Sequence, residues 1–225
     1  MLPNATASRE TPLKTVRPQA DLRGCVFKYV LLLGVAACVA TYLFVLQPEL
    51  AETEENLGAI ASQIAQRPVA VECQGIISQA IDVTNSEGRV EYTEGGAPSD
   101  KTQLKRDVCK RLGGFQATRG AGRYACLVSE LECTDDVLKT VRAVHTLSHE
   151  AWHLAGVKDE RIAECYAMQT DQLVATSVGA SKRLGRAIAV HYATDIYPHL
   201  STKYRSSSCK GGGPYDFSRG SRTWP

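Results

Sequence analysis

The chain has 225 residues, of which 44% are hydrophobic, and its 26 basic and 24 acidic side chains give a formal net charge of +2. This near balance, with no basic patch interleaved with aromatic residues, argues against a nucleic-acid-binding protein. The sequence also contains no Gly-rich phosphate loop or dinucleotide fingerprint, which argues against a nucleotide-dependent enzyme.

An uncharged apolar run lies near the N-terminus. Residues 1–28 are expected to form a cytoplasmic tail. Residues 1–22 of this tail are expected to be disordered, because they are rich in proline, threonine and charge and have no apolar periodicity. The run 29–46 has no charged residue and is near the shortest length that crosses a bilayer core as a helix. Basic residues predominate before it and glutamates follow it, so the positive-inside rule places the rest of the chain outside. We therefore predict a single-pass cell-membrane protein with an extracytoplasmic C-terminal domain.

Two other interpretations of this run remain open. A cleaved signal peptide would need a small-x-small site, and none follows Leu46. A lipoprotein anchor at Cys38 is the second, because Val35–Cys38 resembles a lipobox, although the residues after Cys38 stay apolar. The sequence favours a membrane-spanning anchor over both.

The region after the run divides into a stalk and one domain. Residues 47–68 have apolar residues among charges and alanines, which predicts a helical stalk ended by Pro68. The remaining residues, 69–225, suffice for one hydrophobic core. Their predicted elements are strands at 69–72, 89–92 and 125–128 and a helix at 101–112. With the helices described next, the predicted fold class is mainly α (α+β): a transmembrane helix followed by a small, disulfide-bonded helical domain with a few short strands.

Three longer helices are expected in the second half of this domain. Apolar residues recur every three or four positions between a predicted N-cap at Thr134 and a stop at Gly156. A second helix is expected over 159–177 before Gly179, and a third from a cap at Ser181 to about Tyr197.

The first of these helices carries the motif H-E-x-x-H. His149 and His153 are four residues apart and therefore lie on the same face of a helix, where both imidazoles can reach one Zn²⁺. Glu150 can then serve as a catalytic base towards water at the metal. The motif predicts a zinc site and indicates a metal-assisted hydrolase.

A third metal ligand has two candidates. Glu164 would face the histidines if the next helix folds back, and an H-E-x-x-H helix followed by such a glutamate resembles the gluzincin metallopeptidases. Asp159 completes H-E-x-x-H-x-x-G-x-x-D, which resembles the metzincin pattern with Asp for the last His. Asp159 also suits the N-cap of the next helix, and no Met-turn is evident, so we favour Glu164. His145, one turn before His149, is interpreted as a core residue or a neighbour of the ligands.

The resemblance to gluzincins covers only His145–Met168. It implies a zincin-like domain over residues 69–225 and zinc peptidase chemistry, without indicating a substrate. The Glu-Cys-Tyr-Ala stretch and the ending from Cys209 also resemble bacterial membrane-anchored proteins that carry the same helix, a likeness that implies no activity.

Six of the eight cysteines lie after the apolar run, an even number that predicts three disulfides in an oxidising compartment. Fifteen pairings are possible for six cysteines. We predict two of the bridges, Cys165–Cys209 and Cys109–Cys126.

Together these observations predict a membrane-anchored, extracytoplasmic, zinc-dependent metallopeptidase that acts on a peptide or protein substrate. Its zinc is expected at His149, His153 and Glu164, with Glu150 catalytic. The alternative is a non-catalytic envelope protein with a structural metal, or a disulfide-stabilised interaction module.

Overall fold

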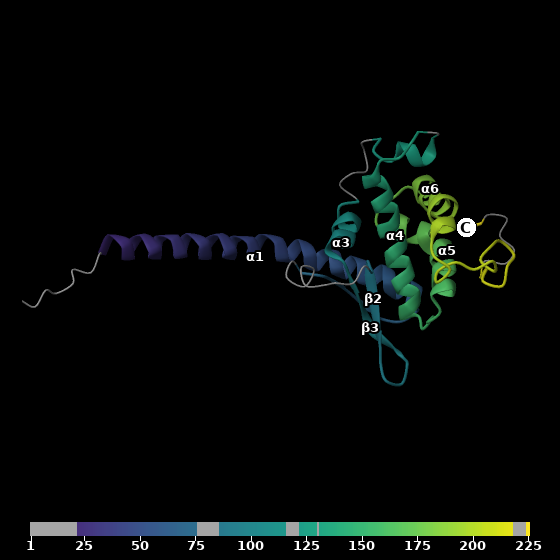
Figure 1. The fold of residues 1–225 in the computed structure, drawn as a ribbon, viewed down its shortest axis with the longest axis horizontal. Helices are drawn as coiled ribbons and strands as arrows, with labels where there is room; N and C mark the ends of the chain where they lie inside the picture. Colours follow the sequence, from purple (N-terminus) through teal and green to yellow (C-terminus); the bar gives the residue numbers. More distant parts are fainter. Residues whose placement is uncertain (1–21, 76–85, 116–121, 130, 218–223) are drawn as a thin grey trace, which may run out of the picture. The chain divides into compact units, whose positions relative to one another are not determined.

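The computed structural model describes residues 22–75, 86–115, 122–129, 131–217 and 224–225 (Figure 1). The chain divides into two compact units, Met1–Leu46 and Gln47–Pro225. One helix, α1 (Leu22–Ala65), contributes residues to both units. The first unit contains the apolar run and the second contains every other helix and strand.

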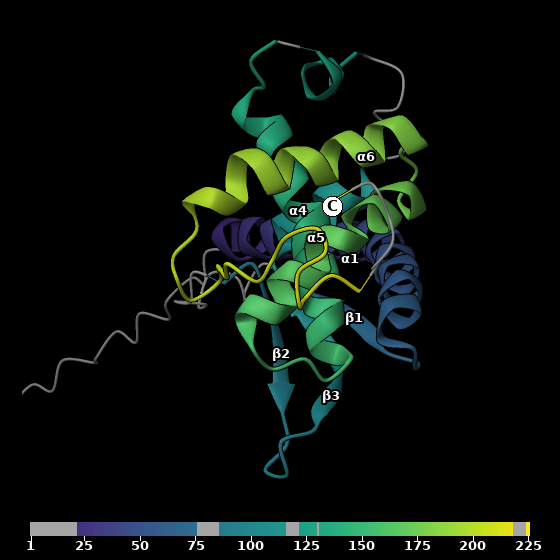
Figure 2. The same ribbon diagram turned by 90° about the vertical axis from the view of Figure 1, so that its right-hand side faces the viewer.

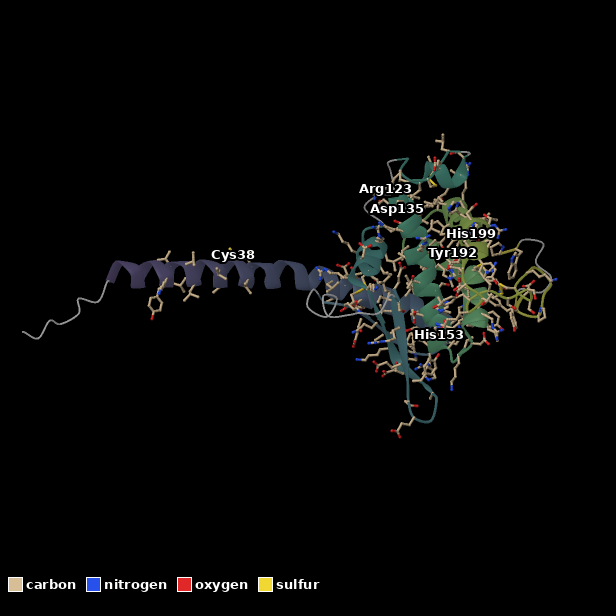
Figure 3. All side chains as sticks on the ribbon, viewed as in Figure 1. Cys38, Arg123, Asp135, His153, Tyr192 and His199 are labelled. Carbon is tan, nitrogen blue, oxygen red and sulfur yellow. A yellow bond between two sulfur atoms is a disulfide. The ribbon has the colours of Figure 1, made fainter. Side chains whose placement is uncertain are left out.

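The predicted transmembrane helix over 29–46 is wrong. In the part of the chain that the structure describes, no helix is both long enough and apolar enough to cross a membrane. The apolar run is near the lower limit of spanning length, and it forms only part of a 44-residue helix that continues into acidic sequence. Cys38, labelled in Figure 3, is exposed on this helix and is not disulfide-bonded.

The segment predicted as a stalk, 47–68, instead contributes to the core of the second unit. Four side chains on one face of this part of α1 are buried: Leu57, Ile60, Ala61 and Ile64. The three- and four-residue spacing of these positions gives a single apolar face. Gly58 lies on the same part of the helix, and a Cβ there would be 3.4 Å from the carbonyl oxygen of Val69. This part of α1 therefore packs closely on the chain that enters the sheet.

A small mixed sheet follows, formed by β1 (Ala70–Cys73), β2 (Gly88–Tyr92) and β3 (Pro98–Leu104). The strand order is β1-β3-β2, with β1 parallel and β2 antiparallel to β3, so β2 is an edge strand. The predicted strands at 69–72 and 89–92 correspond to β1 and β2.

The predicted helix over 101–112 is wrong in its first part. Residues up to Leu104 belong to β3, and the helix α3 covers only Arg106–Gly113. Thr102 and Leu104 are buried at two-residue spacing, because successive side chains of a strand point to opposite faces of the sheet. β3 pairs with a strand on each side. These tertiary contacts outweigh the local helical spacing. The predicted strand at 125–128 is also wrong, since Ala125–Val128 forms a short 3₁₀ helix.

Three helices form the rest of the unit: α4 (Asp135–Leu154), α5 (Glu160–Ser177) and α6 (Lys182–His191). Thr134 occupies the N-cap position of α4, and the Ser181 side chain caps α6 by accepting the Leu184 N–H. The third predicted helix is shorter than expected, because a π-helical turn (Tyr192–Ile196) and a 3₁₀ turn (Tyr197–His199) replace its end. Helices α4 and α5 run side by side in opposite directions, and α6 packs across α5 (Figures 1 and 2).

Three disulfides connect these elements, as the cysteine count predicts: Cys73–Cys109, Cys126–Cys133 and Cys165–Cys209. The predicted Cys165–Cys209 bridge is confirmed, whereas the predicted Cys109–Cys126 bridge is wrong. Cys109 in α3 instead meets Cys73 at the end of β1, with their Cα atoms 6.0 Å apart. The position of β1 in the sheet brings these two cysteines together. Their disulfide closes a longer loop than the predicted Cys109–Cys126 bridge would.

Candidate metal centre

The end of α4 is shaped by Gly156, which has a φ of +97°. The Gly156 N–H donates to the His153 carbonyl oxygen at 2.9 Å, and the Val157 N–H donates to the Trp152 carbonyl oxygen at 3.1 Å. This pair of bonds is the Schellman motif, which requires a left-handed residue that glycine adopts without strain. The turn sends the chain back along α4 after only five residues, Ala155–Asp159.

Three side-chain atoms converge beside this turn. The Nε2 atoms of His149 and His153 are 2.9 Å apart, and they lie 3.1 and 3.2 Å from Oε2 of Glu160. Both histidines are buried, and Glu160 is partly exposed. The convergence of two imidazole nitrogens and one carboxylate oxygen is an arrangement that can hold a metal ion.

Glu160 reaches this position because it is the first residue of α5. The residue before it, Asp159, is the N-cap of α5, and its carboxylate accepts the Arg161 N–H at 2.9 Å. Asp159 therefore performs the capping role that the sequence suggested and is not part of the cluster. Hydrogen bonds from His149 and His153 hold the pKa of Glu160 far below its usual range.

His153 presents its Nε2 atom to the cluster because its other nitrogen is occupied. Nδ1 of His153 lies 2.6 Å from the Val157 carbonyl oxygen, which can only accept, so Nδ1 carries the proton and donates. Nε2 is then the nitrogen that can give up its proton and offer a lone pair to a metal. The Gly156 turn thus fixes both the end of α4 and the tautomer of His153.

Glu164, the predicted third ligand, lies on the opposite side of the His149 ring. Its Oε2 atom is 3.0 Å from Nδ1 of His149 and 3.2 Å from Nε2 of His145. Both pairs lie within ion-pair distance, although neither nitrogen has a partner with hydrogen-bond geometry among the described residues. Glu164 therefore groups with His145 and His149 and not with His153. In the predicted set of His149, His153 and Glu164, the structure brings only the two histidines together at one point.

The neighbourhood of Glu164 is a buried network of charge. Nδ1 of His145 is hydrogen-bonded to Asp171 at 2.9 Å, and the ring of His145 stacks on Tyr192 with centroids 3.5 Å apart. The Tyr192 hydroxyl donates to Oε1 of Glu164 at 2.7 Å. Figure 3 labels Tyr192, which follows α6, and His153, near the end of α4.

Two opposed effects set the charges in this network. Burial lowers the pKa of His145, but attraction to Asp171 and Glu164 outweighs burial and raises it to about 10. Burial raises the pKa of Glu164, and the attraction of His145 and His149 outweighs it, so the net pKa lies well below the usual range. In this network the Glu164 carboxylate lies beside Nδ1 of His149, where it can orient that ring.

Glu150 lies against the sheet on the other side of the cluster. A Cβ on Gly88 of β2 would be 2.6 Å from Cγ of Glu150, so only glycine allows the strand to approach so closely. Burial raises the pKa of Glu150, and its Oε2 atom has no hydrogen-bond partner among the described residues. His149, Glu150, His153 and Glu160 all line one cavity of about 390 Å³.

Comparisons with known proteins place the chain in no family: no family model, no curated protein and no solved structure matches it. The resemblance to gluzincins therefore stays a prediction, and the arguments below are made from the geometry of this chain.

Proposed function

We propose that the protein is a zinc-dependent metallopeptidase whose metal is held by His149, His153 and Glu160 and whose base is Glu150. The observation that carries this proposal is the convergence of the three donor atoms within 3.2 Å of one another at a cavity that also contains Glu150. A site built only for structure would have no use for a buried carboxylate with a raised pKa next to it.

Two imidazoles and one carboxylate favour zinc over other common metals. Calcium and magnesium prefer sets of oxygen ligands, whereas nitrogen and oxygen donors from three residues are typical of catalytic zinc. Zinc supplies a Lewis acid there and lowers the pKa of a coordinated water to about 7.

The residues of the chain would share the remaining work. Glu150 takes a proton from the attacking water and later gives it to the leaving amine of a peptide or protein substrate. Its raised pKa makes it a better proton acceptor than an ordinary glutamate. Glu164, which is itself paired with His145, would hold the His149 ring at its Nδ1 atom.

The three disulfides support a place for this activity outside the cytoplasm. Such bonds form and persist in oxidising compartments and are rare in the reducing cytosol. Assaying the protein with its disulfides intact is therefore part of the test.

The test compares the full chain with Glu150→Gln for zinc content and for cleavage of a peptide library, read by mass spectrometry. We expect both proteins to hold one zinc and the variant to lose at least about a hundredfold in rate. Glu87→Gln is a matched control, because Glu87 lines the same cavity and its carboxylate only accepts a hydrogen bond from Thr146. Equal cleavage by wild type and Glu150→Gln would refute the role of Glu150. Zinc binding without cleavage by the wild type would favour a structural metal.

A further inference from the structure

The segment 200–209 contributes Leu200, Lys203 and Tyr204 to the cavity lining, and its C-terminal part is joined to the rest of the domain. The Cys165–Cys209 disulfide joins its last residue to α5. The Tyr197 hydroxyl, just before the segment, accepts the Ser206 N–H at 2.8 Å and lies 3.2 Å from the Ser206 carbonyl oxygen. We call residues 200–209 the strap. The backbone of the strap is therefore tied to α5 and to Tyr197 close to the metal cluster.

Two side chains of the strap, Lys203 and Tyr204, adjoin the cluster directly. The Lys203 ammonium lies 3.0 Å from Oε1 of Glu160, the oxygen that faces away from His149 and His153. The same ammonium donates to the Tyr204 hydroxyl at 3.2 Å. A positive charge and a hydroxyl thus stand side by side next to the metal-binding carboxylate.

Three tyrosines of the described residues line the cavity: Tyr92, Tyr192 and Tyr204. Only the Tyr204 hydroxyl makes no contact with a histidine or glutamate of the site. The Tyr192 hydroxyl donates to Glu164 at 2.7 Å, and the Tyr92 hydroxyl lies 3.3 Å from Nδ1 of His153. The Tyr204 hydroxyl accepts from Lys203, and the described residues offer it no acceptor. Its proton is therefore available to a ligand in the cavity.

Lys203 differs from the other lysine and arginine side chains that line the cavity in its partner, which is Glu160. Lys158 lies over the Tyr92 ring, 5.5 Å from its centroid, and the nearest carboxylate of Arg89 is Glu91 at 3.8 Å. In the described part of the chain, Lys203 is the one lysine or arginine of the cavity lining that is paired with a carboxylate of the cluster. Positive charge next to the metal ligands therefore comes from the strap.

We propose that Lys203 and Tyr204 form an oxyanion site, which binds the carbonyl oxygen of the scissile peptide bond as that oxygen gains negative charge. This inference rests on the proposed peptidase function. When water attacks the carbonyl carbon, a new C–O bond forms, the π electrons move to the carbonyl oxygen, and the proton of the water passes to Glu150. Collapse of this oxyanion breaks the C–N bond, and Glu150 returns the proton to the amine. Donors placed at such an oxygen stabilise it before the reaction begins.

The test uses acetohydroxamate, a small anionic ligand for metals, with the full-length protein loaded with Co²⁺ at saturation. Binding is followed by the visible absorption of Co²⁺, which does not depend on activity. We expect the dissociation constant to rise on the order of tenfold or more in Lys203→Met and in Tyr204→Phe, because each removes a hydrogen bond to a charged group. Lys158→Met is the matched control, since it removes the same charge elsewhere on the cavity wall, and its effect should stay below about twofold.

Each outcome decides the proposal. Weaker binding in the two strap variants, with Lys158→Met unchanged, supports an oxyanion site. Equal losses in Lys203→Met and Lys158→Met would overturn it in favour of a general effect of charge. Unchanged affinity in both strap variants, with Co²⁺ bound, would overturn it and leave the peptidase proposal intact. Failure of the wild type to bind Co²⁺ or Zn²⁺ would overturn both.

Discussion

Replacing Glu160 with glutamine should release the metal while leaving the fold almost unchanged. Its carboxylate completes the cluster, and the side chain is 30% exposed and also pairs with the exposed Lys203. In the metal-free protein, glutamine keeps a side-chain oxygen that can accept a hydrogen bond from one of the two histidines. Zinc sites with four ligands have apparent binding free energies of about 10 to 16 kcal/mol, or about 3 kcal/mol for each ligand. Losing one ligand should therefore weaken zinc binding by roughly a hundredfold or more. Exposed ion pairs contribute at most about 1 kcal/mol to stability.

Replacing Glu164 should have the opposite pattern. Glu164 is 3% exposed and neutralises His145 inside the protein. Removing one partner of a buried ion pair leaves the other charge unpaired and costs about 3 to 5 kcal/mol of unfolding free energy. Replacing Glu164 changes zinc binding only by altering the orientation of His149. Such indirect changes lower metal affinity by about tenfold to a hundredfold.

The two quantities are measured separately for Glu160→Gln and Glu164→Gln. Zinc affinity comes from titration against a competing chelator, and stability comes from urea unfolding of EDTA-treated protein. Glu87→Gln, on the same cavity, should change neither quantity. If Glu164→Gln abolished zinc binding without loss of stability while Glu160→Gln kept the metal, Glu164 would be the third ligand and our reasoning would be refuted.

Two glycine substitutions test how the scaffold positions the site. Gly88→Ala should push Glu150 aside, because the new Cβ would lie 2.6 Å from its Cγ. We expect the free energy of unfolding in urea to fall by about 1 to 3 kcal/mol. Peptidase activity should also fall, while the zinc content stays unchanged. The neighbouring loop residue Gly95 is the control, since its Cβ would meet only the Thr93 hydroxyl at 3.9 Å. Gly156→Ala meets no atom within 4 Å, so its cost should be the strain of a φ of +97°, about 1 to 2 kcal/mol in the same unfolding assay. Zinc affinity should also fall in Gly156→Ala, because the turn that follows His153 relaxes. If Gly156→Ala had the stability of the wild type, the strain argument would be contradicted.

The helical half of the protein could be predicted because its signals are local. Apolar spacing, caps at Thr134, Asp159 and Ser181, and glycine stops at Gly156 and Gly179 each act within a few residues. The structure has a helix at each predicted position, with differences mainly at the ends. The mainly helical fold with a small sheet and three disulfides is therefore confirmed, while the transmembrane helix is not.

The sheet and its disulfide were harder to predict because they depend on partners distant in sequence. Residues 101–104 have helical spacing with the helix that follows, and only the pairing of β3 with β1 and β2 makes them a strand. The same pairing places Cys73 near Cys109. No short-range pattern encodes that contact, so the nearer cysteine in sequence appeared the better partner for Cys109.

The proposed third ligand, Glu160, shows how the length of a short connection determines which side chains meet. A glutamate one turn inside α5 appeared suitable because helices in an antiparallel pair meet along their length. The Schellman turn at Gly156 instead places the very first residue of α5 beside the end of α4, where His153 lies. Glu160 therefore meets the Nε2 edges of the histidines, and Glu164, four residues and one turn further on, meets the Nδ1 edge of His149. Two glutamates one turn apart thus approach opposite edges of one imidazole, and the length of the connecting turn determines which of them faces the proposed metal site.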